Sequence, residues 1–585
     1  MSAELLLSQK KMKPFPPKLK AAVAGFLLLA LSIVPTGCFT DQNYEPFYGR
    51  VVVPQSQDFR WIDGTLPQTF DPAFAAAPPD TDLVRAIYEG LTDYDPKTLQ
   101  PVPGVATRWE SANEGRTWTF YLRENARWSN GEAVVARDFV DSWRRTMKIG
   151  ELAPHTDLLS NIVGAAAVSV PVVPPRNGNG RGSRSNSDFE SDRAERRFGA
   201  EAIETRVLRV HLQSPDMNFP ALVAHPVFRP VKLAETDSLK RIGPDGLVSN
   251  GAFLLAKQDD ARVLLERDDN YWGRSEIDLE RVEFVGAANA EAALAAYRAG
   301  EVDAVTNSNF EPLALKLLAP YQDFRRQTYG ALTYYRFNLA HAPFDDVRVR
   351  EALAIAIDRE RLSQDEMGGA TEPARKFLPA VESEEAKAVV EQRESLEKDE
   401  TRARELLAEA GYPEGRGFPK IRLLINRNDQ QRLIAQAIAA MWRNILNIET
   451  EIRIKGWDEY EQAILADEYD VVRRGVVMQT TDELTNIRTI FPLDNQRPNV
   501  ADSGQATTGT PNANRNASPS SSVQKAPRII ESEAEALKEL RAIPLYFASS
   551  HALVKPYVKG FDSNLLDLPS LKRVRIDTNW KLANP

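Results

Sequence analysis

The segment 87–147 carries the strongest pattern in the chain and restricts what the chain can fold into. Its middle alternates with a period of two, because Trp118, Phe120 and Leu122 share one face of a predicted strand. Glycine-containing turn sequences precede and follow this strand. A predicted helix comes next, and its apolar side chains recur at every fourth position: Phe139, Trp143 and Met147. A half-buried strand followed by an amphipathic helix predicts a packed α/β subdomain.

Length and charge exclude several classes of protein. At 585 residues the chain is too long for one hydrophobic core, so two or more domains are expected. The net charge is −9 and the body has no dominant basic run, so we predict no nucleic-acid partner. The five histidines are scattered and no cysteine cluster accompanies them, so we predict no metal and no cofactor. No G-x-S-x-G, H-E-x-x-H or P-loop sequence is present, and an enzyme is the least favoured hypothesis.

The N-terminal residues predict export. Five lysines between positions 10 and 20 precede a short apolar run, Ala21–Val34, and Pro35-Thr36-Gly37 leads into the single cysteine, Cys38. This order is typical of an export signal, residues 1–37, because the run is too short to span a bilayer comfortably. A cysteine at this place resembles a bacterial lipobox, although Pro35 stands where Leu is usual. We expect lipid attachment at Cys38, a tether over 38–50, and a periplasmic or cell-envelope location; ordinary cleavage and an uncleaved anchor are the alternatives.

Several spaced motifs resemble those of one family. They are E-G-L-T-D-Y-D-P at 89–96, R-W-S-N-G-E at 127–132, A-R-D-F-V-D-S-W at 136–143, S-N-G-A-F at 249–253 and P-F-D-D-V-R-V-R at 343–350. In this order they are similar to the extracellular solute-binding proteins of the oligopeptide and dipeptide class, also called family five. These proteins are the ligand-capturing subunits of ATP-driven importers. The resemblance runs from about Asp58 to Trp580, interrupted by two insertions rich in small and polar residues.

The resemblance implies an α/β fold with two lobes, an extra subdomain on one lobe, and mixed sheets flanked by helices. We therefore predict the following limits: lobe I from 51–86, 200–305 and 540–585; the subdomain, 87–167; lobe II, 306–498; and low-complexity insertions at 168–199 and 499–530.

The resemblance also implies a ligand cleft between the lobes, closed by hinge motion. In oligopeptide binders an Asp after a strand reading F-D-x₅-W-x₂-D-Y pairs with the ligand's α-amino group. The corresponding strand here begins Tyr469-Asp470, and alignment without gaps puts Gln479 at the position of that Asp. Asp482, three residues further on, could replace it if the loop is rearranged, and Glu483 is a second candidate; for Asp482 the alternative is a helix N-cap before 484–490.

Four further residues are candidate ligand contacts. Tyr334, Tyr335 and Asn338 belong to a strand that the family resemblance places at the cleft; for Tyr335, and for its neighbour Phe337, ordinary strand packing is the alternative. Arg473, or its neighbour Arg474, could pair with a ligand carboxylate, with a solvated or structural role as the alternative.

The sequence thus predicts the solute-binding subunit of an ABC importer. It would capture peptides or peptide-like solutes and deliver them to membrane permease and ATPase subunits. The alternative is a surface lipoprotein of the same fold whose pocket is degenerate and which serves sensing or protein contact, because Gln479 and the two insertions depart from the family pattern.

Overall fold

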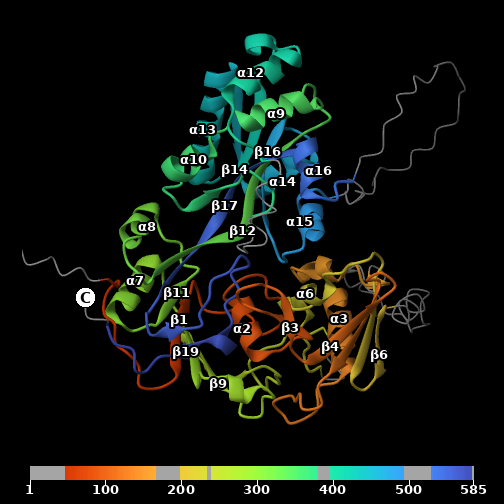
Figure 1. The fold of residues 1–585 in the computed structure, drawn as a ribbon, viewed down its shortest axis with the longest axis vertical. Coiled ribbons are helices and arrows are strands. Elements are labelled where there is room, and N and C mark those ends of the chain that lie inside the picture. Colours follow the sequence, from red (N-terminus) through yellow and green to blue (C-terminus); the bar gives the residue numbers. More distant parts are fainter. Residues whose placement is uncertain (1–45, 166–197, 234–238, 380–394, 493–528, 583–585) are drawn as a thin grey trace, which may run out of the picture. The chain divides into compact units, whose positions relative to one another are not determined.

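A mixed sheet of eleven strands contributes to the two largest hydrophobic cores of the described residues, and Figure 1 shows how its strands are arranged. The structure is a computed structural model, and it describes residues 46–165, 198–233, 239–379, 395–492 and 529–582. The predicted export signal, Cys38 and most of both predicted insertions lie outside these ranges. The strands of the sheet are, in spatial order, β15 (Thr450–Lys455), β14 (Ile421–Asn426), β16 (Val471–Val477), β12 (Phe324–Phe337), β17 (Ala542–Val554), β11 (Ala304–Thr306), β1 (Asp58–Asp63), β10 (Arg281–Val285), β9 (Arg262–Arg267) and β8 (Phe253–Gln258), with β13 (Thr371–Pro373) paired to β17.

The pairing within this sheet is of both kinds. Strand β1 is parallel to β10 and β11, and β14 is parallel to β15 and β16, whereas the remaining pairs are antiparallel. The long strands β12 and β17 pair with each other, with register shifts between Thr328 and Leu332 and between Thr333 and Tyr334. Strand β17 contributes to both cores, whereas β12 contributes to the second core and packs Phe324 against a smaller cluster of the first lobe, so the two lobes share these strands.

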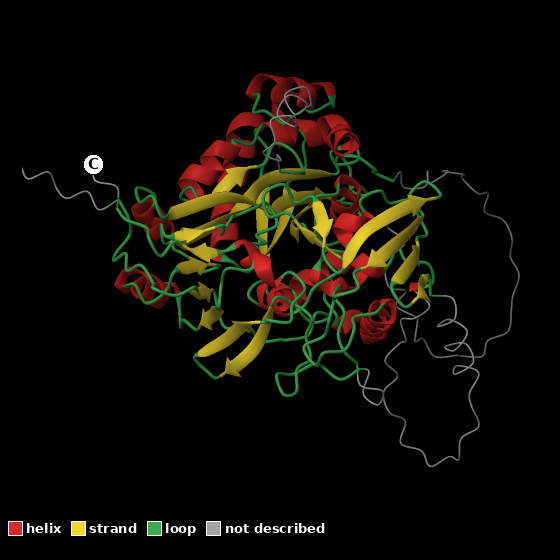
Figure 2. Cartoon of the chain, turned by 60° about the horizontal axis from the view of Figure 1, so that its bottom comes forward, coloured by secondary structure: helices red, strands yellow, loops and turns green. Residues whose placement is uncertain are grey.

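Residues 87–147 contain the strand and the helix that the sequence predicts there. Strand β5 (Thr117–Leu122) buries Trp118, Phe120 and Leu122, and helix α3 (Ala136–Ile149) buries Phe139, Trp143 and Met147. Strand β5 belongs to a four-stranded antiparallel sheet at the right of Figure 2, with β4 (Ala106–Ala112), β6 (Ala200–Glu204) and β7 (Val207–His211). Two of these strands come from the predicted subdomain and two from a segment predicted for lobe I, and the apolar side chains of both join the first core.

Helices flank these strands (Figure 2). In the first lobe they are α2 (Asp80–Ile87), α3, α6 (Phe219–Leu222), α7 (Ala290–Ala299) and α8 (Pro312–Leu318). In the second they are α9 (Val347–Ile355), α10 (Arg359–Arg361), α12 (Glu400–Glu409), α13 (Asp429–Leu446), α14 (Trp457–Leu465), α15 (Glu483–Ile490) and α16 (Glu533–Glu539). Two-stranded pairs complete the fold: β2 (Thr92–Tyr94) with β3 (Pro101–Pro103), and β18 (Val558–Lys559) with β19 (Arg575–Ile576).

The two cores assign segments to lobes independently of the sequence. The first core runs from Phe59 to Ile576 and the second from Leu332 to Phe547. The first half of β17 lies in the second core, although the sequence placed the whole of 540–585 in lobe I. A strand that crosses between lobes belongs to both, so the exact lobe limits stay a prediction.

Candidate ligand-binding cavity

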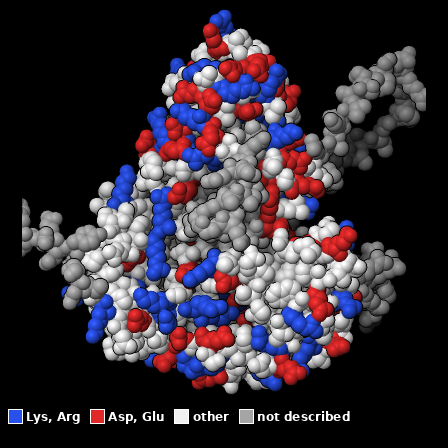
Figure 3. Space-filling view, viewed as in Figure 1, with Lys and Arg blue, Asp and Glu red and all other residues white. Residues whose placement is uncertain are grey.

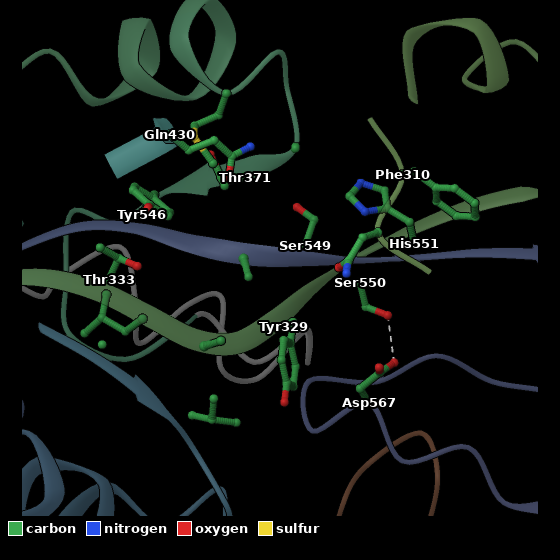
Figure 4. A pocket seen from close by; sticks show the side chains of 18 of the residues that line it. Phe310, Tyr329, Thr333, Thr371, Gln430, Tyr546, Ser549, Ser550, His551 and Asp567 are labelled. Carbon is green, nitrogen blue, oxygen red and sulfur yellow. Dashed lines mark hydrogen bonds between the residues drawn. The ribbon is translucent and has the colours of Figure 1, made fainter. Parts of the chain in front are cut away.

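A polar cavity of about 630 Å³ lies against the shared strands β12 and β17. Its walls also include the segment after β11, the segment 367–371 before and in β13, the start of α13, strand β16, and Asp567 from the loop after β18. Figure 4 shows Tyr546 and Thr333 toward one end of the two strands, and Ser550 and His551 toward the other. The volume suits a small ligand, and the walls come from both lobes.

The end of the cavity at Ser550 holds a carboxylate. Asp567 is 8% exposed, and the Ser550 hydroxyl donates a hydrogen bond to it at 2.7 Å (Figure 4). Burial, together with the nearby carboxylate of Asp63, raises the pKa of Asp567 from 3.8 to about 6. Across the described residues, no lysine or arginine lies within ion-pair distance of Asp567. At neutral pH this carboxylate is therefore charged and has no cationic partner in the described chain.

Two more buried carboxyl groups, those of Asp63 and Asp82, lie near Asp567. Asp63 accepts hydrogen bonds from the Thr306 hydroxyl at 2.7 Å and the Asn307 side chain at 2.6 Å, and burial raises its pKa. Burial and the proximity of Asp63 raise the pKa of Asp82 well above its usual range, although Arg85 lies 3.7 Å away. Like charges so close together cannot all ionise easily, so this end of the cavity favours protons or cations.

The other end of the cavity holds a guanidinium. Arg473 donates to the Thr333 hydroxyl at 3.4 Å, and its Nε is buried without a hydrogen-bond partner among the described residues. Its neighbour Arg474 instead pairs with Glu461 at 3.2 Å. Of the two arginines considered from the sequence, Arg473 lines the cavity and has no carboxylate within ion-pair distance in the described ranges, so it is the one placed to receive an anionic group.

A third titratable side chain in the cavity is held neutral. Burial and the positive charge of Arg326 lower the pKa of His551 from 6.5 to about 4. At pH 7 the cavity walls in the described chain therefore present one carboxylate and one guanidinium among hydroxyls and amides.

Three residues predicted as ligand contacts lie outside this cavity. Tyr334 and Tyr335 are 4% and 0% exposed and pack in the second core, where burial raises the pKa of both phenols. Asn338 is 7% exposed and donates to the carbonyl of Tyr469 at 3.3 Å. The position of Tyr335 agrees with the packing alternative, and a role of all three residues in ligand binding stays a prediction.

Gln479 makes a contact between the lobes. The His225 Nδ1 accepts from the backbone N–H of Val227, so the ring carries its proton on Nε2, which donates to the Gln479 Oε1 at 3.1 Å. Burial and the neighbouring His155 lower the pKa of His225 to about 3, which keeps this ring neutral. Gln479 is thus bound to a protein side chain and does not line the cavity.

Asp482 caps a helix. One of its carboxylate oxygens accepts from the backbone N–H of Thr485 at 2.8 Å and from the Thr485 hydroxyl at 2.7 Å, at the start of α15. The other oxygen accepts from the side chain of Asn218 in the first lobe. The N-cap that the sequence offered as the alternative is present, and Asp482 does not line the cavity.

Sequence reasoning missed the cavity's own polar groups. Asp567 and Ser550 are far from Asp63 and Asn307 in sequence, and no motif or period marks them. The last strands of the chain resemble those of the family, and this similarity assigned β17 to the first lobe. It did not indicate which side chains of β17, or of the loop that carries Asp567, face a ligand.

No group of three or more His, Cys, Asp or Glu side chains in the described ranges is arranged to hold a metal ion. None of the helices in the same ranges combines the length and apolar character that a membrane crossing needs. On the surface over α9 and α12, basic and acidic side chains are interspersed (Figure 3), as in the ion pair of Arg402 with Glu409 at 3.1 Å.

Two lobes that share a mixed sheet, with a polar cavity walled by both, define a binding protein of the two-lobed periplasmic type. The chain belongs to the bacterial extracellular solute-binding proteins of family 5, whose middle region matches residues 100–497. This is the family that the sequence motifs resembled, and the match confirms that prediction.

Curated relatives cover nearly the whole chain. The periplasmic murein peptide-binding protein MppA of Escherichia coli is 29% identical over 517 residues, which are 85% of this chain and 89% of the relative. The periplasmic oligopeptide-binding protein OppA of E. coli is 28% identical over 562 residues, covering 93% of this chain and 94% of the relative. A probable deoxycholate-binding periplasmic protein of E. coli, YgiS, is 28% identical over 526 residues, 87% of this chain and 91% of the relative.

Solved structures confirm the two-lobed fold. The unliganded open form of MppA superposes with a TM-score of 0.69 at 26% identity, covering 90% of this chain and 98% of the other. The Haemophilus influenzae OppA complex with the peptide RPPGFSPFR gives a TM-score of 0.58 at 25% identity, covering 90% of this chain and all of the other.

Proposed function

We propose that this protein is the ligand-capturing subunit of an ABC importer and that it binds peptides or peptide-like solutes in the cavity against β12 and β17. The observation that carries the proposal is the cavity itself, which is walled by both lobes and presents an unpaired carboxylate and an unpaired guanidinium within the described chain. The names of MppA and OppA as peptide-binding proteins support a peptide as the ligand class. The role requires capture and release, and no catalysis.

Closure of the lobes would complete the binding site. The two strands that cross between lobes have their register shifts beside the cavity, at Thr328–Leu332 and Thr333–Tyr334, where the regular ladder is interrupted. Interrupted pairing bends more easily than a continuous ladder, so these positions are the expected hinge. Delivery would then follow docking of the closed form on a membrane permease whose ATPase lies across the membrane.

A thermal-shift screen tests the ligand class. The purified protein is mixed with pools of di- to hexapeptides, and with deoxycholate because YgiS is a relative of similar identity. A ligand at one hundred times its Kd should raise the unfolding free energy by about 2.7 kcal/mol. A response to a peptide pool supports the proposal, whereas a response to deoxycholate alone, or to nothing, contradicts peptide capture.

Export and lipid attachment at Cys38 form a second part of the proposal. The support is the order of a basic segment, a short apolar run and a cysteine, in residues that lie outside the described ranges. Metabolic labelling with palmitate in a bacterial host should label the wild type and leave the Cys38→Ser variant unlabelled. Equal recovery of both proteins without label in the soluble fraction would contradict lipid attachment and leave peptide capture unaffected.

A further inference from the structure

The cavity is electrically asymmetric along the shared strands. Its carboxylate, Asp567, is bound to Ser550, and its guanidinium, Arg473, is bound to Thr333. In the described chain neither group has an oppositely charged side chain within ion-pair distance. Both face the same cavity, so a ligand with two opposite charges could satisfy both.

Buried polar atoms in the cavity wall also lack partners. Over the described residues, the Gln431 Oε1 and the Arg473 Nε are buried and make no hydrogen bond. Gln431 is itself more than nine-tenths buried, and its amide nitrogen donates to the Tyr546 hydroxyl at 2.7 Å. Unsatisfied buried groups are uncommon in native proteins, and these two belong to residues that line the cavity.

The register of the strands shows how far apart the hydrogen-bond partners of the two charges, Thr333 and Ser550, lie. Ser550 pairs with Gln327, and Tyr546 pairs with Thr333. From 546 to 550 along β17 is about 13 Å, at about 3.3 Å per residue, whereas β12 covers the same span with two more residues because its ladder is irregular between Thr328 and Leu332. An extended peptide of about four residues is this long.

We propose that Asp567 is the binding partner of a free ammonium group on the solute, and that the solute lies with its amino end at Asp567 and its anionic end toward Arg473. The inference rests on the proposed peptide capture and specifies which end of the ligand each lobe receives. Asp63 and Asp82 lie near Asp567, and burial raises the pKa of both, so this end of the cavity disfavours further negative charge and favours a cation. Gln479, which is uncharged and bound to His225, takes no part.

The physical reason is the cost of an unpaired charge. A carboxylate that is more than nine-tenths buried and has no cation beside it is expensive to keep ionised, and an ammonium offsets that cost. An N-acetylated peptide has no α-ammonium group, so it cannot offset the charge of Asp567. The preference for a free amine therefore depends on Asp567.

The test compares a pool of tetra- to hexapeptides that have free amino termini with the same pool after N-acetylation. Affinities are measured by isothermal titration at pH 7.5 for the wild type and for D567N, D567E and D562N. Asp562 is on the same loop and is half-buried, yet it does not line this cavity, so D562N is the matched control. Circular dichroism melts establish that each variant is folded.

We expect acetylation to weaken binding to the wild type and to D562N by about 30-fold or more, the usual loss when one partner of a buried charge pair is removed. D567N should lose affinity for the free pool by a similar factor and bind both pools alike, whereas D567E should keep a preference for the free pool. If D567N keeps the wild-type preference, or if the wild type binds both pools equally, the assignment of Asp567 is overturned while peptide capture stands. If neither pool binds the wild type, peptide capture and the assignment fail together.

Discussion

Replacing Asp567 by Asn should stabilise the unliganded protein at neutral pH. The amide keeps the shape of the carboxyl group and can still accept the Ser550 hydrogen bond, but it carries no charge. In the wild type, burial and Asp63 raise the pKa of Asp567 from 3.8 to about 6. A carboxyl whose folded pKa is raised contributes its full stability below the unfolded pKa and loses it as pH rises through the folded value.

The magnitude follows from the two pKa values. A rise from 3.8 to about 6 corresponds to about 3 kcal/mol of unfolding free energy that is lost once the group ionises. The side chains that face Asp567 come from several elements: Asp63 of β1, Asp82 of α2, Asn307 after β11, Tyr329 of β12 and Ser550 of β17. Because Asp63 and Asp82 also titrate and can relax, we expect a net gain of about 1–3 kcal/mol for the variant at pH 7.5.

Urea unfolding at pH 4, 5, 6 and 7.5 measures the effect. The difference between D567N and the wild type should be smallest at pH 4 and should grow through pH 6, because the wild type loses stability as Asp567 ionises. D562N serves as the control and should follow the wild type. A D567N protein that is less stable than the wild type at pH 7.5, or a difference that does not change with pH, would refute the reasoning.

Three further predictions concern other residues. Arg145 donates to both carboxylate oxygens of Asp71, at 2.9 and 2.5 Å, in the buried interior of the first lobe. D71N should therefore lower the unfolding free energy by about 3–5 kcal/mol in urea titrations. A loss below about 1 kcal/mol would contradict the importance of this pair. D482A should cost about 1 kcal/mol through the lost N-cap of α15, whereas D482N should cost less, and equal losses for the two would indicate a role other than capping. R473Q should weaken the binding of peptides with a free C-terminal carboxylate by about tenfold or more in titrations, because it removes the guanidinium. The binding of C-amidated peptides should not change. An equal loss for both kinds of peptide would contradict a contact between Arg473 and the carboxylate.

The parts of the fold that the sequence predicted are those governed by local periodicity. The alternation of Trp118, Phe120 and Leu122 and the spacing of Phe139, Trp143 and Met147 each require one buried face, and the structure buries both sets. The N-cap at Asp482 is similarly local, because it depends on a side chain and a backbone N–H three residues apart.

The cavity could not be predicted in the same way. Strand β12 is paired on both sides, by β16 and β17, and Tyr334 and Tyr335 are buried on its opposite faces, so alternation did not distinguish core from cavity. Gln479 was expected beside the ligand by ungapped alignment, but its side chain is held by His225 from the other lobe. Asp567 reaches the cavity from the loop after β18, and only the three-dimensional fold brings it to Ser550.

The first lobe is assembled from both ends of the described chain. The side chain of Gln57 donates to the carbonyl of Ile576 at 2.9 Å and accepts from its backbone N–H at 2.9 Å, across 519 residues of sequence. Contacts so distant in sequence slow folding, because a long loop must close before they form. The second lobe, by contrast, lies between these ends and holds most of its core within one stretch. As the chain emerges from a ribosome or from an export channel, the second lobe can begin to fold first, and the first lobe must wait for the last residues before it closes around its own N-terminal strand.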